Sequence, residues 1–127
     1  MSEETQQKLQ QVLTDFKASQ KQYSKTVAQV RKLEGQLQEN AAVKKELELI
    51  KDDAEVFKLI GPILVKQEPV EARQTVDKRM SYIQGELKRL EDTISSLDTK
   101  QESLQQKLNE LQAKMVQEQQ KQPSARV

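Results

Sequence analysis

The chain has 127 residues, of which 35% are hydrophobic and 32% are charged, and its formal net charge is +1. It contains no cysteine and no histidine, which excludes disulfides, thiolate chemistry and imidazole acid–base catalysis. A compact globule of this length would need more apolar volume to fill its centre. Long helices that each bury only a narrow apolar stripe need less. Charges of both signs alternate along the chain without a basic block, so we expect no nucleic acid partner.

Residues 1–53 predict a long first helix. Ser2 can cap its first turn, and Glu3 and Glu4 complement the positive end of the helix dipole. Apolar residues recur at helical spacing, but the alternation of three- and four-residue steps is interrupted, which predicts a less regular coiled-coil partner. The expected seam, meaning the stripe that faces another helix, consists of Leu9, Leu13, Phe16, Gln20, Tyr23, Val27, Val30, Leu33, Leu37, Asn40, Val43, Leu47 and Ile50.

Residues 54–68 predict a β-hairpin. Two five-residue runs rich in β-branched side chains flank the pair Gly61-Pro62. An isolated apolar hairpin is unstable in water, so we expect it to bury its faces and edges against another chain. The apolar stretch 56–65 is too short to cross a bilayer, and we expect no membrane contact. The expected assembly residues are Val56, Phe57, Leu59, Ile60, Ile63, Leu64 and Val65.

Residues 69–118 predict a second coiled-coil helix. Pro69 suits the first helical position, and steps of four and three then continue without a break. The seam consists of Val76, Met80, Ile83, Leu87, Leu90, Ile94, Leu97, Gln101, Leu104, Leu108, Leu111 and Met115. The polar residues 119–127 lack a stripe and are expected to form a disordered tail.

The predicted fold class is mostly α, a long antiparallel two-helix coiled coil joined by a central β-hairpin. Two helices of similar length with a short connection fold back on each other, and the two seams can then be aligned. The expected facing pairs are Leu13 with Leu111, Phe16 with Leu108, Val27 with Leu97, Val30 with Ile94, and Leu37 with Leu87.

The run Phe57-Lys58-Leu59-Ile60-Gly61-Pro62-Ile63-Leu64-Val65-Lys66-Gln67, placed between two coil arms, resembles β-class subunits of the prefoldin family. The segment from Leu37 to Leu47 and the triplet Glu71-Ala72-Arg73 strengthen the resemblance. It implies a chaperone subunit in a heterohexamer with two α-class and three further β-class subunits. Unfolded clients such as actin and tubulin would be held at the coil tips and passed to the cytosolic chaperonin.

The resemblance further implies no ATP, no other cofactor and no enzymatic activity. The scattered glycines Gly35, Gly61 and Gly85 form no phosphate-binding loop, and no metal site is expected. The polar, acidic start of the chain does not resemble a signal peptide, so a cytoplasmic protein is expected.

The tip is the end of the coiled coil farthest from the hairpin, near both chain ends. Because Val12 and Val116 lie beside the predicted seams, we expect them to be the most exposed apolar residues there. The others could simply close the coil, or alternate between the seam and a bound client. The candidate client-binding residues are Leu9, Val12, Leu13, Phe16, Leu108, Leu111, Met115 and Val116.

A structural coiled-coil tether or scaffold is the alternative interpretation. The second seam, with leucine at Leu90, Leu97, Leu104 and Leu111, could also pair in a parallel homodimer. That interpretation assigns no role to the hairpin.

Overall fold

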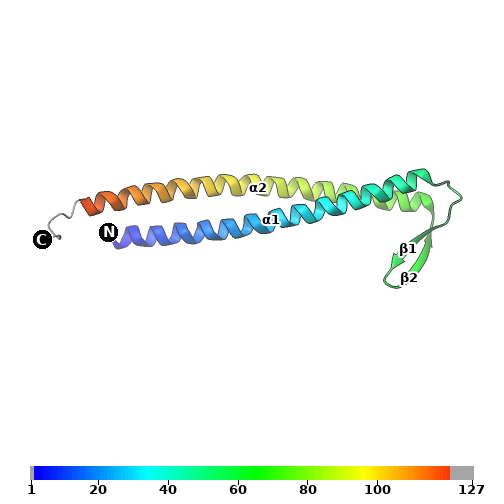
Figure 1. The fold of residues 1–127 in the computed structure, drawn as a ribbon, viewed down its shortest axis with the longest axis horizontal. Coiled ribbons are helices and arrows are strands. Elements are labelled where there is room, and N and C mark those ends of the chain that lie inside the picture. Colours follow the sequence, from blue (N-terminus) through cyan, green and yellow to red (C-terminus); the bar gives the residue numbers. More distant parts are fainter. Residues whose placement is uncertain (1, 121–127) are drawn as a thin grey trace. The chain divides into compact units, whose positions relative to one another are not determined.

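A computed structural model describes residues 2–120 of the chain (Figure 1). The elements are helix α1 (Glu3–Leu49), strands β1 (Val56–Ile60) and β2 (Ile63–Gln67), and helix α2 (Pro69–Gln120). The predicted fold class is confirmed: two long helices form an antiparallel coiled coil joined by a two-stranded hairpin. No helix within residues 2–120 is long and apolar enough to cross a membrane.

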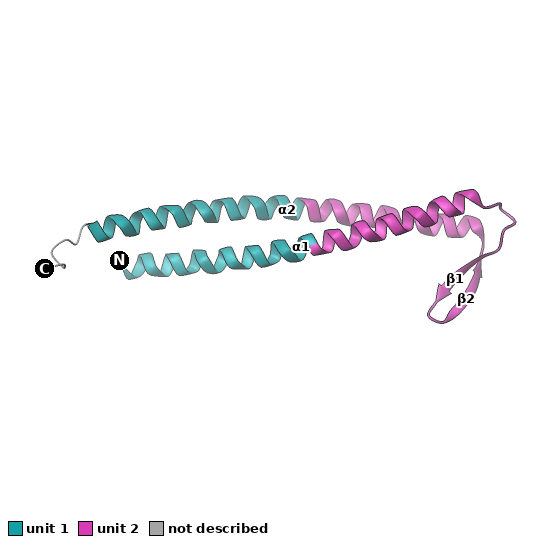
Figure 2. Cartoon of the chain, viewed as in Figure 1, with its two compact units in different colours: residues 1–27, 92–127 teal, residues 28–91 magenta. Residues whose placement is uncertain are grey.

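The chain divides into two compact units (Figure 2). Unit 1 contains the start of α1 and the end of α2, within residues 1–27 and 92–127. Unit 2, residues 28–91, contains the rest of both helices and the hairpin. In unit 1 the first turn of α1 contacts the last turns of α2, and in unit 2 the end of α1 packs on the start of α2, so the helices are antiparallel in each unit.

The buried residues of α2 follow the predicted seam. Val76, Ile83, Leu90, Leu97 and Leu104 are spaced seven residues apart, and each is only 5–7% exposed. A seven-residue repeat keeps one face of a helix toward its partner. The helix continues through Gln119 and Gln120, which the sequence had assigned to the disordered tail; the rest of that tail, 121–127, lies outside the described residues.

The seam of α1 differs from the predicted one. Thr5, Ser19 and Thr26 are at most 4% exposed, whereas Leu13 is 40% exposed and Gln20 is exposed. With these small hydroxyl residues included, the four-and-three alternation has no interruption. The buried or partly buried seam positions are Thr5, Leu9, Val12, Phe16, Ser19, Tyr23, Thr26, Val30, Leu33, Leu37, Asn40, Lys44 and Leu47.

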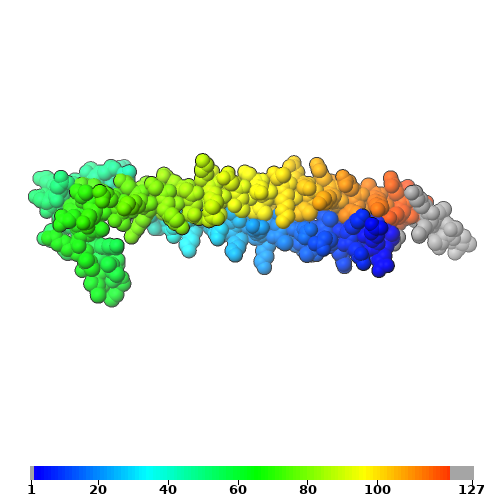
Figure 3. Space-filling view, turned by 180° about the vertical axis from the view of Figure 1, so that it is seen from behind, coloured from blue at the N-terminus to red at the C-terminus, as the bar shows by residue number. Residues whose placement is uncertain are grey.

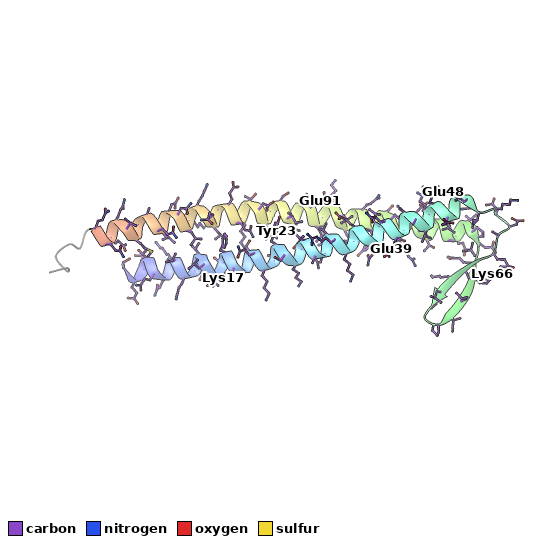
Figure 4. The ribbon with its side chains drawn as sticks, in the orientation of Figure 1. Lys17, Tyr23, Glu39, Glu48, Lys66 and Glu91 are labelled. Carbon is purple, nitrogen blue, oxygen red and sulfur yellow. The ribbon has the colours of Figure 1, made fainter. Side chains whose placement is uncertain are left out.

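Small side chains on α1 lie level with larger side chains on α2. Thr5 contacts Glu118, and Val12 and Leu111 line one groove. Each step of seven residues forward along α1 corresponds to a step of seven residues back along α2. A further such step places Ser19 level with Leu104, a leucine that is only 6% exposed. The predicted pair Leu13–Leu111 is therefore wrong. The sequence analysis admitted mainly apolar residues to the seam of α1, and this placed the seam at Leu13 in place of Val12. In Figure 4 Tyr23 lies on the side of α1 that faces α2, and Lys17 points away.

Arg73 binds the C-terminal end of α1. Its guanidinium donates hydrogen bonds to the carbonyl oxygens of Leu47 (3.0 Å) and Ile50 (3.2 Å) and to Oδ1 of Asp52 (3.0 Å). Carbonyl groups at a helix C-terminus lack partners within the helix, and a cation there also complements the dipole. The helix ends at Leu49, short of the predicted residue 53.

The hairpin turns at Gly61-Pro62. Gly61 has φ of +56°, and the proline ring fixes a negative φ at the next position, a combination that corresponds to a type II′ turn. Cα partners run from Val56 with Gln67 to Ile60 with Ile63. At the base of the hairpin, Val56 packs against the buried cluster of Leu47, Ala72 and Val76, which attaches the hairpin to the helices of unit 2.

Candidate functional site

The hairpin carries an uncovered apolar surface. In Figures 1 and 3 it projects from the helices of unit 2. Of the seven predicted assembly residues, Val56 is partly buried in the base of the hairpin. The other six, 44–68% exposed, are Phe57, Leu59, Ile60, Ile63, Leu64 and Val65. Within residues 2–120 the sheet has only these two strands, so the outer edge of each strand keeps its backbone groups free for another chain.

The second surface is a groove in unit 1, hereafter the tip groove, with a volume of about 450 Å³. Its apolar floor comes from Val12 on α1 and from Leu104 and Leu111 on α2. Its polar rim consists of Lys8, Gln11, Asp15, Lys107, Glu110 and Lys114. An apolar floor with charges of both signs around it can accept apolar side chains of varied sequence, because the hydrophobic contact is non-directional.

The structure separates the predicted client-binding residues into three groups. Val12 and Leu111 line the tip groove, and Leu9 lines a shallower hollow on the first turns of α1. Leu108 is only 8% exposed and belongs to the seam, while Phe16 and Met115 are partly buried. Leu13 (40%) and Val116 (53%) are exposed.

The expected exposure of Val12 is wrong, because the seam of α1 passes through Val12 and leaves Leu13 outside. Val116 is exposed as predicted. The sequence did not assign Leu104 to client binding, because the candidates on the second helix were taken only from residue 108 onward, near the chain end.

A polar clasp closes the end of unit 1. The carboxylate of Glu118 accepts hydrogen bonds from the backbone N–H of Ser2 (3.0 Å) and from Oγ1 of Thr5 (3.0 Å). The Ser2 hydroxyl also accepts a bond from the Thr5 N–H at 3.1 Å, which is the predicted N-cap. The bond from the Ser2 backbone is the main cause that lowers the pKa of Glu118 below its usual value.

No group of three or more metal-ligating side chains that could hold an ion occurs within residues 2–120. Apart from Glu118, the titratable groups with shifted pKa values lie in ion pairs on the surface. The Lys44 ammonium bonds Asp77 at 2.9 Å, which raises the pKa of Lys44. Glu86 likewise raises the pKa of Arg89. Exposed pairs of this kind contribute little to stability.

The fold and its two apolar surfaces define a class of protein: a coiled-coil subunit built to contact other polypeptides. A family model described as a prefoldin subunit matches residues 10–115. The chain therefore belongs to the prefoldin family, whose members are chaperone subunits.

Relatives within the family agree with the assignment. The chain is 50% identical over 86 residues to prefoldin subunit 6 of Mus musculus, an alignment that covers 68% of each chain. It is 44% identical over 81 residues to prefoldin subunit 6 of Arabidopsis thaliana, covering 64% of this chain and 63% of the relative. The crystal structure of the prefoldin beta subunit from Thermococcus strain KS-1 superposes with a TM-score of 0.73 at 25% identity, covering 80% of this chain and 90% of that one.

Proposed function

We propose that this chain is an ATP-independent chaperone subunit that captures unfolded proteins at its tip and assembles through its hairpin. The observation that carries the proposal is that two apolar surfaces stay uncovered in the chain by itself, one in each unit. A tether would need neither surface. A client-holding subunit of an oligomer needs both.

The hairpin supplies the assembly surface. Six large apolar side chains at 44–68% exposure are costly to leave in water, at roughly 25 cal/mol for each Å² of apolar area. Hairpins of neighbouring subunits can cover them and extend the sheet through the free strand edges. The partners proposed are two α-class and three further β-class prefoldin subunits.

The tip supplies the client surface. The floor of the tip groove and the exposed Leu13 and Val116 present apolar area in unit 1. Each contact is weak by itself, but several subunits that grip one client combine their contacts through effective concentration. The proposed clients are unfolded chains such as actin and tubulin, which pass to the cytosolic chaperonin in the cytoplasm without nucleotide hydrolysis.

Assembly is tested by changing Phe57, which is 51% exposed. Phe57→Asp should prevent entry into the hexamer on co-expression with the other subunits, because it places an unpaired carboxylate in the buried interface. Phe57→Leu is the matched control and should enter normally. Native mass spectrometry measures the yield of hexamer that contains each variant. A normal yield with Phe57→Asp would exclude the hairpin as the assembly surface.

Client capture is tested by light scattering with a chemically unfolded client and hexamers at equal concentration. A hexamer lacking residues 1–16 and 108–127 of this chain, and one carrying Leu13→Ser with Val116→Ser, should suppress aggregation less well than wild type. Other subunits should leave partial activity. Ala18→Ser with Ala113→Ser, two exposed changes on the same helices, is the control. Equal protection by all four hexamers would show that this tip holds no client.

A further inference from the structure

Two hollows of unit 2 share one lining residue, Arg79, and residues of the hairpin line the smaller of them. One has a volume of about 410 Å³ and the other about 310 Å³. Because Arg79 lines both, we treat them as one surface, the hairpin groove. The residues that line it are Leu33, Gln36, Asn40, Val43, Leu47, Val56, Phe57, Lys58, Leu59, Gln67, Ala72, Thr75, Val76, Lys78, Arg79, Tyr82 and Ile83.

The hairpin groove carries charge of one sign. Lys58, Lys78 and Arg79 line it, and no aspartate or glutamate does. The imbalance is local, since the whole chain has 21 Lys and Arg against 20 Asp and Glu. The tip groove differs, because Asp15 and Glu110 line it together with lysines.

The cations of the hairpin groove have no carboxylate partner among residues 2–120. On a helix, ion pairs form between side chains three or four residues apart. The residues at those distances from Lys78 and Arg79 on α2 are all uncharged: Gln74, Thr75, Val76, Ser81, Tyr82 and Ile83. The positive charge is therefore available to a group from outside the chain.

Apolar side chains complete the groove. Tyr82 is 69% exposed, and the exposed Val43 and Phe57 also line the groove. An aromatic ring next to an arginine and a lysine can contact an apolar side chain on a ligand while the cations bind nearby carboxylates.

We propose that the hairpin groove binds an acidic segment of a neighbouring subunit, with carboxylates on Arg79 and Lys78 and an apolar residue against Tyr82. This inference rests on the proposed assembly through the hairpin, because Phe57 and Leu59 belong to both surfaces. The chain's own residues 121–127 are unsuitable occupants, since their charged side chains are Lys121 and Arg126.

A zero-length carbodiimide tests the proposal in the assembled hexamer, because this reagent joins a carboxylate to a lysine amine only when the two are in contact. We expect an amide between Lys78 and an aspartate or glutamate of a neighbouring subunit, located by peptide mass spectrometry. Lys78→Arg keeps the charge but removes the reactive amine, so it should abolish that crosslink and leave the hexamer intact.

Subunit exchange provides a second measurement. Arg79→Glu should speed release of this chain from the hexamer about tenfold, since loss of a paired charge acts mainly on dissociation. Tyr82→Ala should speed it less. Lys88→Glu makes the same charge change at an exposed position of α2 outside the groove and should have no effect.

The outcomes separate the two proposals. If wild-type subunits form no hexamer, the assembly proposal fails and this one fails with it. If the hexamer forms but Lys78 crosslinks to no neighbouring subunit, or Arg79→Glu exchanges at the wild-type rate, only the hairpin groove proposal is overturned. A crosslink from Lys78 to a carboxylate of this chain itself would overturn the choice of occupant.

Discussion

The hydroxyl of Thr5 donates a hydrogen bond to Oε1 of Glu118 at 3.0 Å and so joins the first turn of α1 to the end of α2. Ser2 strengthens the link through its backbone N–H, which donates to the same carboxylate. Polar contacts, and not apolar packing, therefore join the two helices at this end of unit 1. Separation of the first turn of α1 from α2 would break both of these hydrogen bonds.

Glu118→Ala should loosen the tip. Loss of the carboxylate removes the acceptor for Ser2 and Thr5, so amide hydrogen exchange in the first turns of α1 should become about tenfold faster. Glu102→Ala, at an exposed position of α2 in the same unit, is the control and should leave exchange unchanged. Equal exchange in both variants would show that the clasp does not hold the tip.

The clasp should also depend on pH. The pKa of Glu118 is lowered by its hydrogen bonds, so the folded tip prefers the ionised carboxylate. The stabilisation of the tip by the clasp is therefore fully present above the pKa of about 4.3 that a glutamate has in an unfolded chain. It is lost as the pH falls through the lower pKa that Glu118 has in the folded chain. An NMR titration of the Glu118 carboxyl carbon should give a midpoint below about 4.3, the usual value for a glutamate side chain. A midpoint equal to or above it would contradict the prediction.

Ser19 should be replaceable with a gain in stability. Its side-chain oxygen is buried and has no hydrogen-bond partner in the described residues, so Ser19→Ala should raise the free energy of unfolding by about 1 kcal/mol. Ser19→Leu should lower it by about 1 to 3 kcal/mol through overpacking against the opposite helix. Urea denaturation measures both, with the exposed Ser24→Ala as a neutral control. Destabilisation by Ser19→Ala would indicate that the hydroxyl has a partner.

Arg73 should be important for unit 2. Arg73→Ala leaves the carbonyl groups of Leu47 and Ile50 without their charged donor, and we expect unit 2 to lose about 2 to 3 kcal/mol. Arg73→Lys should recover only part of this, because an ammonium cannot reproduce the planar fork of a guanidinium. Thermal unfolding measures the loss of stability. Arg31→Ala, at an exposed position of α1, is the control. A similar loss in both alanine variants would argue against the capping role.

The sequence predicted the elements whose signal is local and apolar. The unbroken stripe from Val76 to Met115 indicated α2, and the two β-branched runs around Gly61-Pro62 indicated the hairpin. The seam of α1 was misplaced because Thr5, Ser19 and Thr26 are small and polar. Such residues become seam positions only when larger side chains of the opposite helix cover them, which the sequence of α1 does not reveal.

Contacts between residues distant in sequence account for the other differences. The end of α1 is bound by Arg73, which is far along the chain. The clasp joins Ser2 and Thr5 to Glu118, and a small error in helix register was enough to exchange the predicted exposures of Val12 and Leu13. The hairpin groove depends on the placement of the hairpin beside α2, which no local pattern specifies.

The most direct test of client capture places a photoreactive amino acid at Val116, an exposed position of the tip, in the assembled hexamer. Illumination with chemically unfolded actin should give a crosslinked product of this subunit with actin. The same photoreactive amino acid at Ser81, which is exposed on α2 in unit 2, should give little crosslinked product with actin. Strong crosslinking at Val116 alone is the predicted result, and equal crosslinking at both positions, or none at Val116, would contradict capture at the tip.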